Sequence, residues 1–241
     1  MDDYRARFYE NYEDHKEWEF GKPEADGEYY VEEWARIGLS GKQKIIEIGF
    51  GSGGFLVWAK AAGHEVVGTE VNPGLVKEAK KRELNALESK DLSVFLIPTA
   101  INKTYDLIMA FDVLEHLFPD EISTIFQQAA SLLKDGGKFY ARFPNAQSPF
   151  SLQLQNADVT HVTSLTTTKL LQVATKYGFE LEFVGNAARP KHFGRKPAWQ
   201  RKILFLCRDL FEIIIGNLYF GGAVPLDPNL SVVLVKRKSA Q

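Results

Sequence analysis

Short apolar runs alternate with longer amphipathic stretches along most of this 241-residue chain. Runs rich in β-branched residues, bounded by polar or glycine positions, are typical of strands buried on both faces of a sheet. They predict strands at 45–48, 65–70, 105–111, 138–144, 179–186 and 230–236. Apolar positions at helical spacing predict helices at 28–37, 54–60, 74–82, 121–133 and 166–177. The alternation of the two kinds of element predicts an α/β fold built on a parallel sheet.

A glycine-rich turn follows the first predicted strand, in the stretch Glu47-Ile48-Gly49-Phe50-Gly51-Ser52-Gly53. Glycines lack a Cβ atom, so this backbone can take left-handed angles and approach a ligand closely before the next helix begins. Glu70 ends the second strand, 21 residues after Gly49. An acid at that distance can accept both ribose hydroxyls of a bound adenosine. The pattern predicts a pocket for a nucleotide-like cofactor.

Two classes of cofactor fit this pocket. Gly49, Gly51 and Gly54, with Glu70 as the ribose acid, match the G-x-G-x-x-G pattern of proteins that bind NAD. Glu47 favours the other class, because a buried strand that supports only a pyrophosphate has no use for a charge at that position. A cationic cofactor would be oriented by this carboxylate, and S-adenosylmethionine carries both an ammonium and a sulfonium. An NAD-linked oxidoreductase stays open as the alternative.

The segment from Glu47 to Gly53 resembles the first motif of the class I S-adenosylmethionine-dependent methyltransferases, E/D-x-G-x-G-x-G. Residues 106–117 resemble the D-x-I-x-x-x-x-V-L-E-H-L signature of the ubiquinone and small-molecule branch of that family. Residues 134–138 match the family's L-K-P-G-G turn before strand five, with Asp135 in place of the proline. The similarity covers residues 40–186, and the order of the motifs is more specific than any one of them alone.

The resemblance implies a Rossmann-like, doubly wound sheet of seven strands with a terminal antiparallel strand. It implies an N-terminal helical lid at 1–39, the cofactor-binding core at 40–186, an insertion at 187–229, and the last strand and tail at 230–241. It also implies a third strand at 86–92, in which Asp91 contacts the adenine amine and Leu92 the ring. The cofactor-binding residues implied by the family are Glu47, Gly49, Gly51, Gly53, Glu70, Val71, Asp91, Leu92, Phe111 and Asp112.

The residues that act on the methyl acceptor are less well defined. Methyl transfer from a sulfonium is an in-line displacement, which needs the nucleophile held about 3 Å from the methyl carbon. A base matters only for a weakly acidic alcohol, and the candidates are His161, His116 and Glu115. The alternative for His161 is a hydrogen bond to its own loop, and the alternative for His116 is packing below the cofactor.

Composition limits the cellular context. A hydrophobic content of 45% and a charged content of 25% are ordinary for a globular protein, and a net charge of −2 gives no general attraction to nucleic acid. The single cysteine, Cys207, excludes an internal disulfide and suits a reducing cytoplasm. The charged start of the chain predicts no signal peptide, and the charges within 203–220 argue against a spanning helix. We therefore expect a cytoplasmic protein.

Two segments stand outside the motifs. Residues 1–39 are rich in aromatic side chains, which predicts either a lid over the cofactor or a cover for the sheet edge. The insertion contains a basic stretch followed by an amphipathic segment. Its basic residues are Arg189, Lys191, Arg195, Lys196, Arg201, Lys202 and Arg208. The segment 189–220 is predicted either to contact a phosphorylated acceptor or an anionic membrane surface, or to pack on the core or on a second subunit of an oligomer.

We expect methyl transfer to an oxygen of a small acceptor. By resemblance, a sugar of a surface polysaccharide or of its lipid-linked precursor is the favoured acceptor, ahead of a quinone-like or other metabolite. A cofactor-binding protein without catalysis is a third hypothesis. Nucleic acid is not expected as a partner, because the residues after the fourth strand lack the N/D-P-P-Y/F clamp for a flipped base. No metal is expected either, since Asp112, Asp158 and Asn145 make too small a ligand set.

Overall fold

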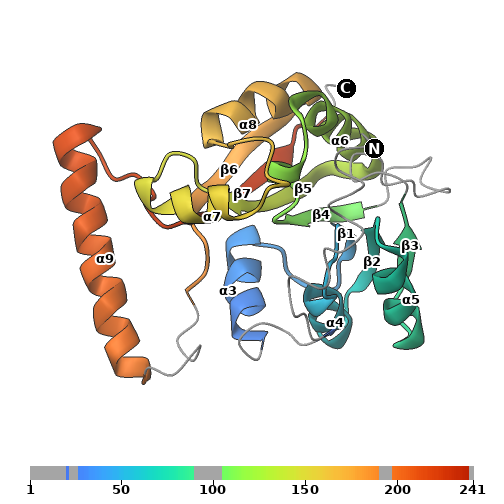
Figure 1. Ribbon diagram of the computed structural model, residues 1–241. Helices are drawn as coiled ribbons and strands as arrows, with labels where there is room; N and C mark the ends of the chain where they lie inside the picture. Colours follow the sequence, from blue (N-terminus) through green and yellow to red (C-terminus); the bar gives the residue numbers. More distant parts are fainter. Residues whose placement is uncertain (1–19, 22–26, 90–104, 190–196, 239–241) are drawn as a thin grey trace.

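A seven-stranded sheet forms the centre of the protein (Figure 1). The computed structural model describes residues 20–21, 27–89, 105–189 and 197–238, and every structural statement below concerns these residues. The strands are β1 (Lys44–Ile48), β2 (Glu65–Glu70), β3 (Ala86–Glu88), β4 (Tyr105–Phe111), β5 (Leu133–Pro144), β6 (Phe179–Asn186) and β7 (Asn229–Lys236). Their order across the sheet is β3-β2-β1-β4-β5-β7-β6, with β1 to β5 parallel and β7 antiparallel to both of its neighbours. This is the doubly wound α/β fold with a terminal antiparallel strand that the sequence predicts.

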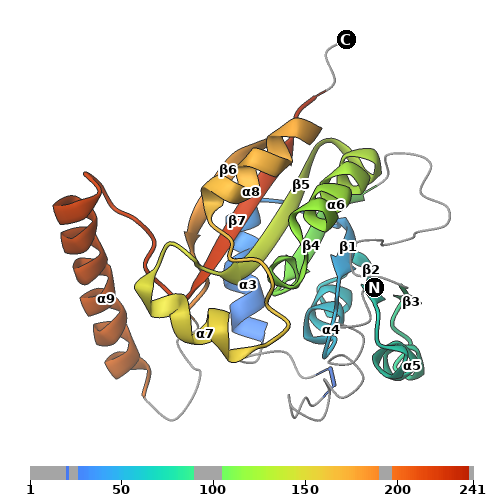
Figure 2. The ribbon, with the colours of Figure 1, turned by 45° about the horizontal axis from the view of Figure 1, so that its top comes forward.

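Helices cover both faces of the sheet (Figures 1 and 2). The helices of the described residues are α3 (Glu28–Ile37), α4 (Gly54–Ala61), α5 (Pro73–Lys81), α6 (Pro119–Leu132), α7 (Leu152–Ala157), α8 (Thr167–Ala174) and α9 (Ala198–Tyr219), with 3₁₀ turns η2 (Leu114–His116), η3 (Pro149–Ser151) and η4 (Thr175–Tyr177). Successive residues of a strand point to opposite faces, so Ile45 packs with α3 and α4 while Ile46 packs with α6 and α8. Leu107 and Ile108 of β4 likewise pack on opposite faces, Leu107 with Ile45 and Ile108 with Ile46. Because both faces are covered, the central strands are mostly apolar, with Glu47 of β1 as a buried exception, which explains their apolar runs in the sequence.

The predicted bounds of four elements, α3, β2, β4 and β6, match the observed ones. The prediction for β5 is wrong at its start, because this strand begins at Leu133, directly after α6, rather than at residue 138. The turn predicted at 134–138 lies inside the strand as an irregularity, where the register to β4 shifts between Tyr105 and Leu107. Gly136 accommodates it with a φ of 79°, a backbone angle that favours glycine.

Two other predicted elements are shorter than expected. The helix predicted at 166–177 divides into α8 and the 3₁₀ turn η4. The third strand ends at Glu88, whereas the sequence predicts that it continues to residue 92. Asp91 and Leu92, the predicted adenine contacts, lie outside the described residues.

Helix α3 covers a face of the sheet. Tyr29 and Tyr30 are buried in one core with Met109 and Tyr140, which come from β4 and β5. The described part of the N-terminal segment therefore packs over the face of the sheet, where the sequence analysis expected either a lid or a cover for the sheet edge. Most residues of the predicted lid, 1–19 and 22–26, lie outside the described part of the chain.

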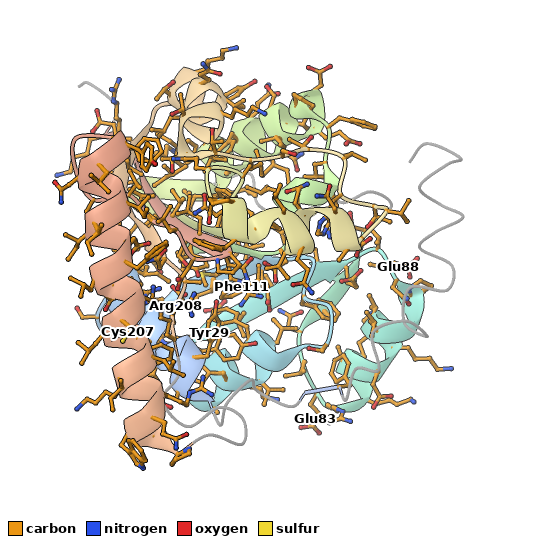
Figure 3. The ribbon with its side chains drawn as sticks, turned by 60° about the vertical axis from the view of Figure 1, so that its left-hand side comes forward. Tyr29, Glu83, Glu88, Phe111, Cys207 and Arg208 are labelled. Atoms are coloured by element: carbon orange, nitrogen blue, oxygen red, sulfur yellow. The ribbon has the colours of Figure 1, made fainter. Side chains whose placement is uncertain are left out.

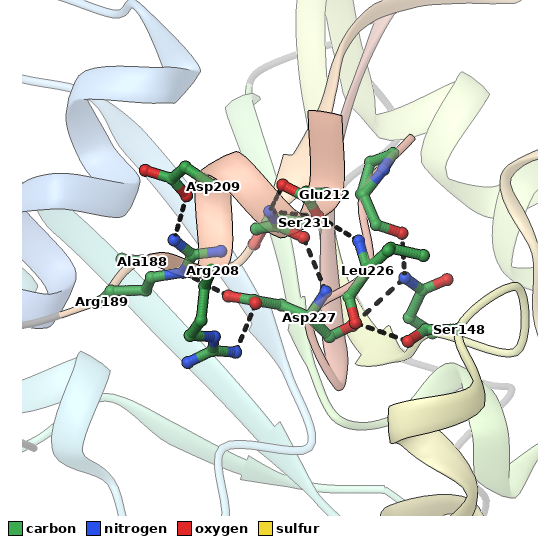
Figure 4. Close-up of polar contacts among 12 residues, drawn as sticks. Ser148, Ala188, Arg189, Arg208, Asp209, Glu212, Leu226, Asp227 and Ser231 are labelled. Atoms are coloured by element: carbon green, nitrogen blue, oxygen red, sulfur yellow. Dashed lines mark hydrogen bonds and ion pairs between the residues drawn. The ribbon is translucent and has the colours of Figure 1, made fainter. Parts of the chain in front are cut away.

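Helix α9 stands apart from the helices that cover the sheet (Figure 1). It is held to the body by ion pairs: Arg189 pairs with Asp209 at 2.5 Å and with Asp227, and Arg208 also pairs with Asp227 (Figure 4). Figure 3 shows Arg208 extending from α9 toward the rest of the protein. From the sequence, Arg189 and Arg208 belong to a basic stretch that either contacts a ligand or membrane surface or packs on the protein. Their ion pairs with acids from α9 and from the loop before β7 favour the second alternative for these two residues. Lys191, Arg195 and Lys196 lie outside the described residues.

Further contacts on the same side of α9 complete its attachment. The amide nitrogen of Asn186 donates to both carboxylate oxygens of Glu212 at 2.8 Å. A Cβ atom at Gly216 would lie 2.4 Å from the carbonyl oxygen of Gly222, so the helix and the following loop touch backbone to backbone. The polar side of α9 thus faces the protein.

The opposite side of α9 is apolar and exposed. Its exposed large apolar side chains are Trp199, Ile203, Leu204, Leu206, Leu210, Phe211, Ile213, Ile214, Leu218 and Tyr219. Leu206 is 66% exposed and Leu218 is 71% exposed, so most of this face is uncovered among the described residues. Phe211 contacts the protein, with its ring 6.0 Å from that of Phe150, centre to centre. No helix in the described part of the chain has both the length and the apolar character needed to cross a membrane.

Gly68 in β2 allows the glycine-rich turn to pack closely on the sheet. A Cβ atom there would lie 2.6 Å from the ring of Phe50 and 2.8 Å from a methyl group of Leu56. We expect Gly68→Ala to lower the free energy of unfolding by about 2 kcal/mol, because an overpacked core must shift to make room. For a chain of this size, that corresponds to a fall in the thermal midpoint of roughly 5 °C, measured by circular dichroism.

The control for this prediction is Gly222→Ala, since an added Cβ atom at Gly222 meets nothing within 4 Å. We expect its thermal midpoint to match that of the unsubstituted protein. An unchanged midpoint in Gly68→Ala would contradict the close packing described here.

Candidate active site

A cleft of about 430 Å³ opens at the carboxyl ends of β1, β2 and β4. The sheet order reverses between β1 and β4, and open α/β sheets bind ligands at such a switch point. The cleft is lined on one side by Glu47, Glu70 and the glycine turn, which we call the glutamate side. It is also lined by Glu115, His116 and His161, which we call the histidine side.

The glycine turn has the backbone that the sequence predicts. Gly49, Gly51 and Gly53 have φ angles of 61°, 50° and 71°, in the left-handed region that other residues rarely adopt. The backbone nitrogen of Gly49 donates to the carbonyl oxygen of Thr69 at 2.8 Å, which holds the turn against β2. Helix α4 begins directly after the turn, so its first-turn N–H groups are positioned to interact with polar atoms of a ligand.

Glu70, at the end of β2, is hydrogen-bonded to the backbone around it. Its carboxylate accepts hydrogen bonds from the backbone nitrogens of Gly51 at 3.0 Å, Val71 at 2.8 Å and Asn72 at 3.1 Å. A carboxylate has about four lone-pair sites, so accepting two ribose hydroxyls requires the exchange of at least one of these contacts. The predicted ribose role of Glu70 therefore implies a small rearrangement of the turn when a ligand binds. Val71 contributes its backbone at this corner.

Glu47, in β1, is a buried acid with an unsatisfied oxygen. Its side chain is 3% exposed, and Oε2 has no hydrogen-bond partner among the described residues. Burial, and to a smaller extent the nearby carboxylate of Glu70, raise the pKa of the Glu47 carboxyl well above its usual range. A ligand cation at this position would offset both effects, which is the property expected of a site for an ammonium group.

Asp112 follows β4 in the left-handed backbone region, with a φ of 52°. Its carboxylate forms a two-pronged ion pair with Arg142 of β5, in which Nε donates to Oδ1 at 3.0 Å and a second nitrogen donates to Oδ2. Arg142 also donates to the hydroxyl of Tyr29 at 2.6 Å, and burial raises the pKa of that hydroxyl, so it stays protonated. Asp112, a predicted cofactor residue, thus lines the cleft with its charge already paired with Arg142.

Arg142 is a residue of the cleft that the sequence analysis missed. Its guanidinium lies 5.3 Å from the ring centre of Phe111, the predicted cofactor residue at the end of β4, and 5.1 Å from that of Tyr29. Figure 3 labels both aromatic residues. The available signal was its place as the one charged residue in the otherwise apolar run 139–144.

The histidine side joins two segments that are far apart in the sequence. Glu115 and His116 belong to η2, directly after β4, while His161 lies in the loop between α7 and α8. The backbone nitrogens of Val162 and Thr163 both donate to the carbonyl oxygen of Glu115, at 2.9 and 3.0 Å. The rings of His116 and His161 lie 4.7 Å apart, centre to centre. The structure thus brings all three predicted acceptor-side residues together.

The strand order, the glycine turn and the acids at the strand ends together define a Rossmann-like methyltransferase class of protein. The model of a family described as a methyltransferase domain matches residues 18–183. This chain belongs to that family. The match confirms the class I S-adenosylmethionine-dependent methyltransferase family predicted from the sequence, and it disfavours the NAD-linked alternative.

Solved structures with the same fold come from several organisms. A SAM-dependent methyltransferase from Archaeoglobus fulgidus is 19% identical, with a TM-score of 0.64 over 87% of this chain and 92% of that one. An S-adenosylmethionine-dependent methyltransferase from Mesorhizobium loti is 16% identical, with a TM-score of 0.60 over 87% of this chain and 98% of that one. A TehB-like SAM-dependent methyltransferase from Corynebacterium glutamicum is 18% identical, with a TM-score of 0.55 over 97% of this chain and 96% of that one. No curated protein matches the chain.

We expect the buried carboxyl of Glu47 to make cofactor binding dependent on pH. A cation binds the ionised form, so the affinity for S-adenosylmethionine should weaken as the pH falls through the raised pKa of this group. We expect Glu47→Gln to weaken binding by roughly 10- to 100-fold, the range for loss of a charge-assisted hydrogen bond, and to flatten this pH dependence. Titration calorimetry across about pH 5 to 8 measures both effects. The matched control is Glu65→Gln, an exposed acid at the other end of β2.

The same substitution should have the opposite effect on the stability of the cofactor-free protein. Because the folded chain holds the Glu47 proton more tightly than the unfolded chain, the free energy of unfolding falls as the pH rises above the ordinary pKa. Glu47→Gln removes that loss, so its thermal midpoint at neutral pH should exceed that of the unsubstituted protein. Unchanged cofactor affinity together with a lower midpoint would contradict the role given to Glu47.

Proposed function

We propose that this protein transfers the methyl group of S-adenosylmethionine to an oxygen atom of a small acceptor, a sugar of a surface polysaccharide or of its lipid-linked precursor. The observation that carries the donor side of this proposal is the buried carboxyl of Glu47, whose Oε2 has no partner among the described residues. The ammonium group of the donor would give this oxygen a positively charged hydrogen-bond partner. Glu70 takes the ribose, and the glycine turn lets the backbone approach the donor closely.

The histidine side of the same cleft supports transfer to an oxygen. A hydroxyl must lie about 3 Å from the methyl carbon, and its proton must leave as the new bond forms. His161, His116 and Glu115 line the cleft together and are the groups suited to handle that proton. In the displacement, the oxygen bonds to the methyl carbon as the carbon–sulfur bond breaks, and the sulfonium leaves as a neutral thioether.

Helix α9 supports an acceptor that is held at a membrane surface. An ordinary surface helix turns its apolar side inward, whereas α9 turns its polar side to the protein and exposes its apolar side. Trp199 and Tyr219 lie at its two ends, and such aromatic residues favour the boundary between lipid and water. Lys202 is exposed on the first turns of the helix, where it suits an anionic surface. We propose that α9 rests on the membrane and brings the cleft to a lipid-linked acceptor.

This arrangement fits action on the cytoplasmic side of the membrane. Cys207, on α9, is a free and exposed thiol, which suits a reducing compartment. A quinone-like acceptor is the second candidate, because it too would be reached from the membrane surface through α9.

Methyl-labelled S-adenosylmethionine distinguishes these acceptors. The purified full chain is incubated separately with lipid-linked glycans and with quinone-rich lipids extracted from the source organism. We expect label in the glycan fraction, as a methyl ether that survives mild base. His161→Ala should lower turnover by about a hundredfold, while its calorimetric affinity for S-adenosylmethionine is unchanged. Label in the quinone fraction alone would favour the second candidate, and intact cofactor binding without any transfer would favour a binding protein without catalysis.

The membrane contact is tested by sedimentation with vesicles containing phosphatidylglycerol. Replacing Leu206, Leu210 and Leu218 together by serine should weaken binding by about tenfold or more, because these side chains leave water when α9 rests on lipid. The fold should be unaffected, since all three are exposed. The control is Val31→Ser, which removes an exposed apolar residue of α3. Undiminished vesicle binding by the triple variant would contradict the proposal, and a dimer that dissociates in that variant would assign α9 to a second copy of this chain.

A further inference from the structure

We propose that Glu115, His116 and His161 bind a divalent transition-metal ion of the zinc type. One donor atom from each of these residues lies within 4.8 Å of the others. Two imidazoles and one carboxylate are a known set of three protein ligands for a catalytic zinc ion, which keeps its fourth position open for water or substrate. The sequence alone indicates only Asp112, Asp158 and Asn145 as a ligand set, because His161 is far from Glu115 and His116 along the chain.

The hydrogen bond of His161 leaves one of its ring nitrogens suited to a metal. Nδ1 lies 3.2 Å from the backbone carbonyl oxygen of Gln155. A carbonyl can only accept, so Nδ1 carries the proton and Nε2 of the neutral ring presents its lone pair. From the sequence, a hydrogen bond to the loop backbone is the alternative to a chemical role for His161. The observed partner is instead in α7, and this contact is compatible with metal binding. Metal-binding histidines usually have such a partner on the other nitrogen.

His116 is oriented by a chain of two hydrogen bonds. The hydroxyl of Thr160 donates its proton to Oδ1 of Asp158 at 2.5 Å. Its oxygen, 2.8 Å from Nδ1 of His116, must then accept the Nδ1 proton. The backbone carbonyl of Thr160 lies 3.3 Å from the same nitrogen and can also only accept. Nε2 of His116 is thus the nitrogen with the lone pair. Asp158 orients the ring of His116 indirectly, through the hydroxyl of Thr160.

The backbone around the cluster is tightly fixed. The carbonyl oxygen of Glu115 accepts from two nitrogens of the loop that carries His161, and the hydroxyl of Thr163 donates to the carbonyl of Leu117 at 2.6 Å. Donor atoms of a tetrahedral zinc ion lie about 3.4 Å apart, given bonds of about 2.1 Å. Closing the cluster from 4.8 Å requires side-chain rotation, and His161 is the least buried of the three. Glu115 and His116 are buried, which limits competition from water.

The location of the cluster gives the ion a role that rests on the proposed function. The cluster lines the same cleft as Glu47 and the glycine turn, so an ion there would be next to the acceptor oxygen. A bound divalent cation lowers the pKa of a coordinated hydroxyl, whose proton is then released to water. The resulting alkoxide attacks the methyl carbon, and the carbon–sulfur electron pair returns to sulfur. The three residues then act as ligands in place of a general base.

Cobalt and zinc titrations of the full-length protein test the site without any acceptor. After removal of metal with a chelator, Co²⁺ should produce the visible absorption of a low-symmetry complex with nitrogen ligands at about one ion per chain, and Zn²⁺ should displace it. We expect His161→Ala and Glu115→Gln each to weaken Zn²⁺ binding by about a hundredfold or more. His64→Gln, which changes a histidine outside the cluster, should bind like the unsubstituted protein.

Thr160→Val tests the positioning chain with a change that keeps the shape of the side chain. It should weaken Zn²⁺ binding by roughly 10- to 100-fold, the range for partners of metal-binding histidines. Thermal unfolding without metal checks that each variant is folded, and calorimetry with S-adenosylmethionine checks the glutamate side separately. Intact cofactor binding with no Zn²⁺ binding at micromolar concentrations would overturn the metal site and leave the proposed function standing. Zn²⁺ binding that His161→Ala leaves unchanged would overturn it equally.

Discussion

The burial of Glu47 is the constraint on which the rest of the cleft depends. Adjacent parallel strands end at the same edge of the sheet, so Glu47 of β1 and Glu70 of β2 are close enough for each to affect the other. Glu70 is stabilised by three backbone N–H groups, whereas Oε2 of Glu47 has no such partner among the residues described. A protein keeps an uncompensated buried acid at a cost in stability, which a bound cation recovers. The electrostatics of the cleft therefore favour a positively charged ligand.

Close to Glu47, other charged side chains of the cleft are already paired with each other. Arg142 and Asp112 neutralise each other at the end of β4, and the hydroxyl of Tyr29 holds the guanidinium from α3. Tyr30 and Phe111 pack edge to face at 5.7 Å and complete an aromatic wall beside this pair. Helix α3 is thus part of the cleft as well as of the core. A ligand entering the cleft meets Glu47, whose Oε2 has no hydrogen-bond partner among the described residues, and an ion pair that is already satisfied.

Outside the core, two features suggest how a general fold acquires a particular acceptor. The loop between α7 and α8 brings His161 against His116 through backbone hydrogen bonds, so its chemistry is positioned rigidly. Helix α9 is attached through ion pairs and hydrogen bonds on its polar side, and its apolar side is left exposed. Exposed apolar patches of this kind usually mark a surface that contacts lipid or another protein. In the proposed function, the first feature serves the methyl transfer and the second determines where the transfer takes place.

Much of the fold could be predicted from the sequence because its determinants are local. The β-branched runs specify strands buried on both faces, the left-handed angles of Gly49, Gly51 and Gly53 follow from their missing side chains, and Glu70 ends its strand at a characteristic spacing. The order of these motifs also specified the family. The start of β5 was missed because a glycine-rich bulge and a glycine-rich turn have the same local pattern.

Only the tertiary structure decided which charges are paired and which side chains converge. Arg142 reaches Asp112 across neighbouring strands, Asp227 neutralises Arg189 and Arg208 from a distant loop, and His161 meets His116 from 45 residues away. The direction of α9 was also undetermined, since an amphipathic pattern specifies two faces but not which of them meets the protein. These properties depend on distances between residues far apart in the chain, and a distance of that kind exists only once the sheet has brought the segments together.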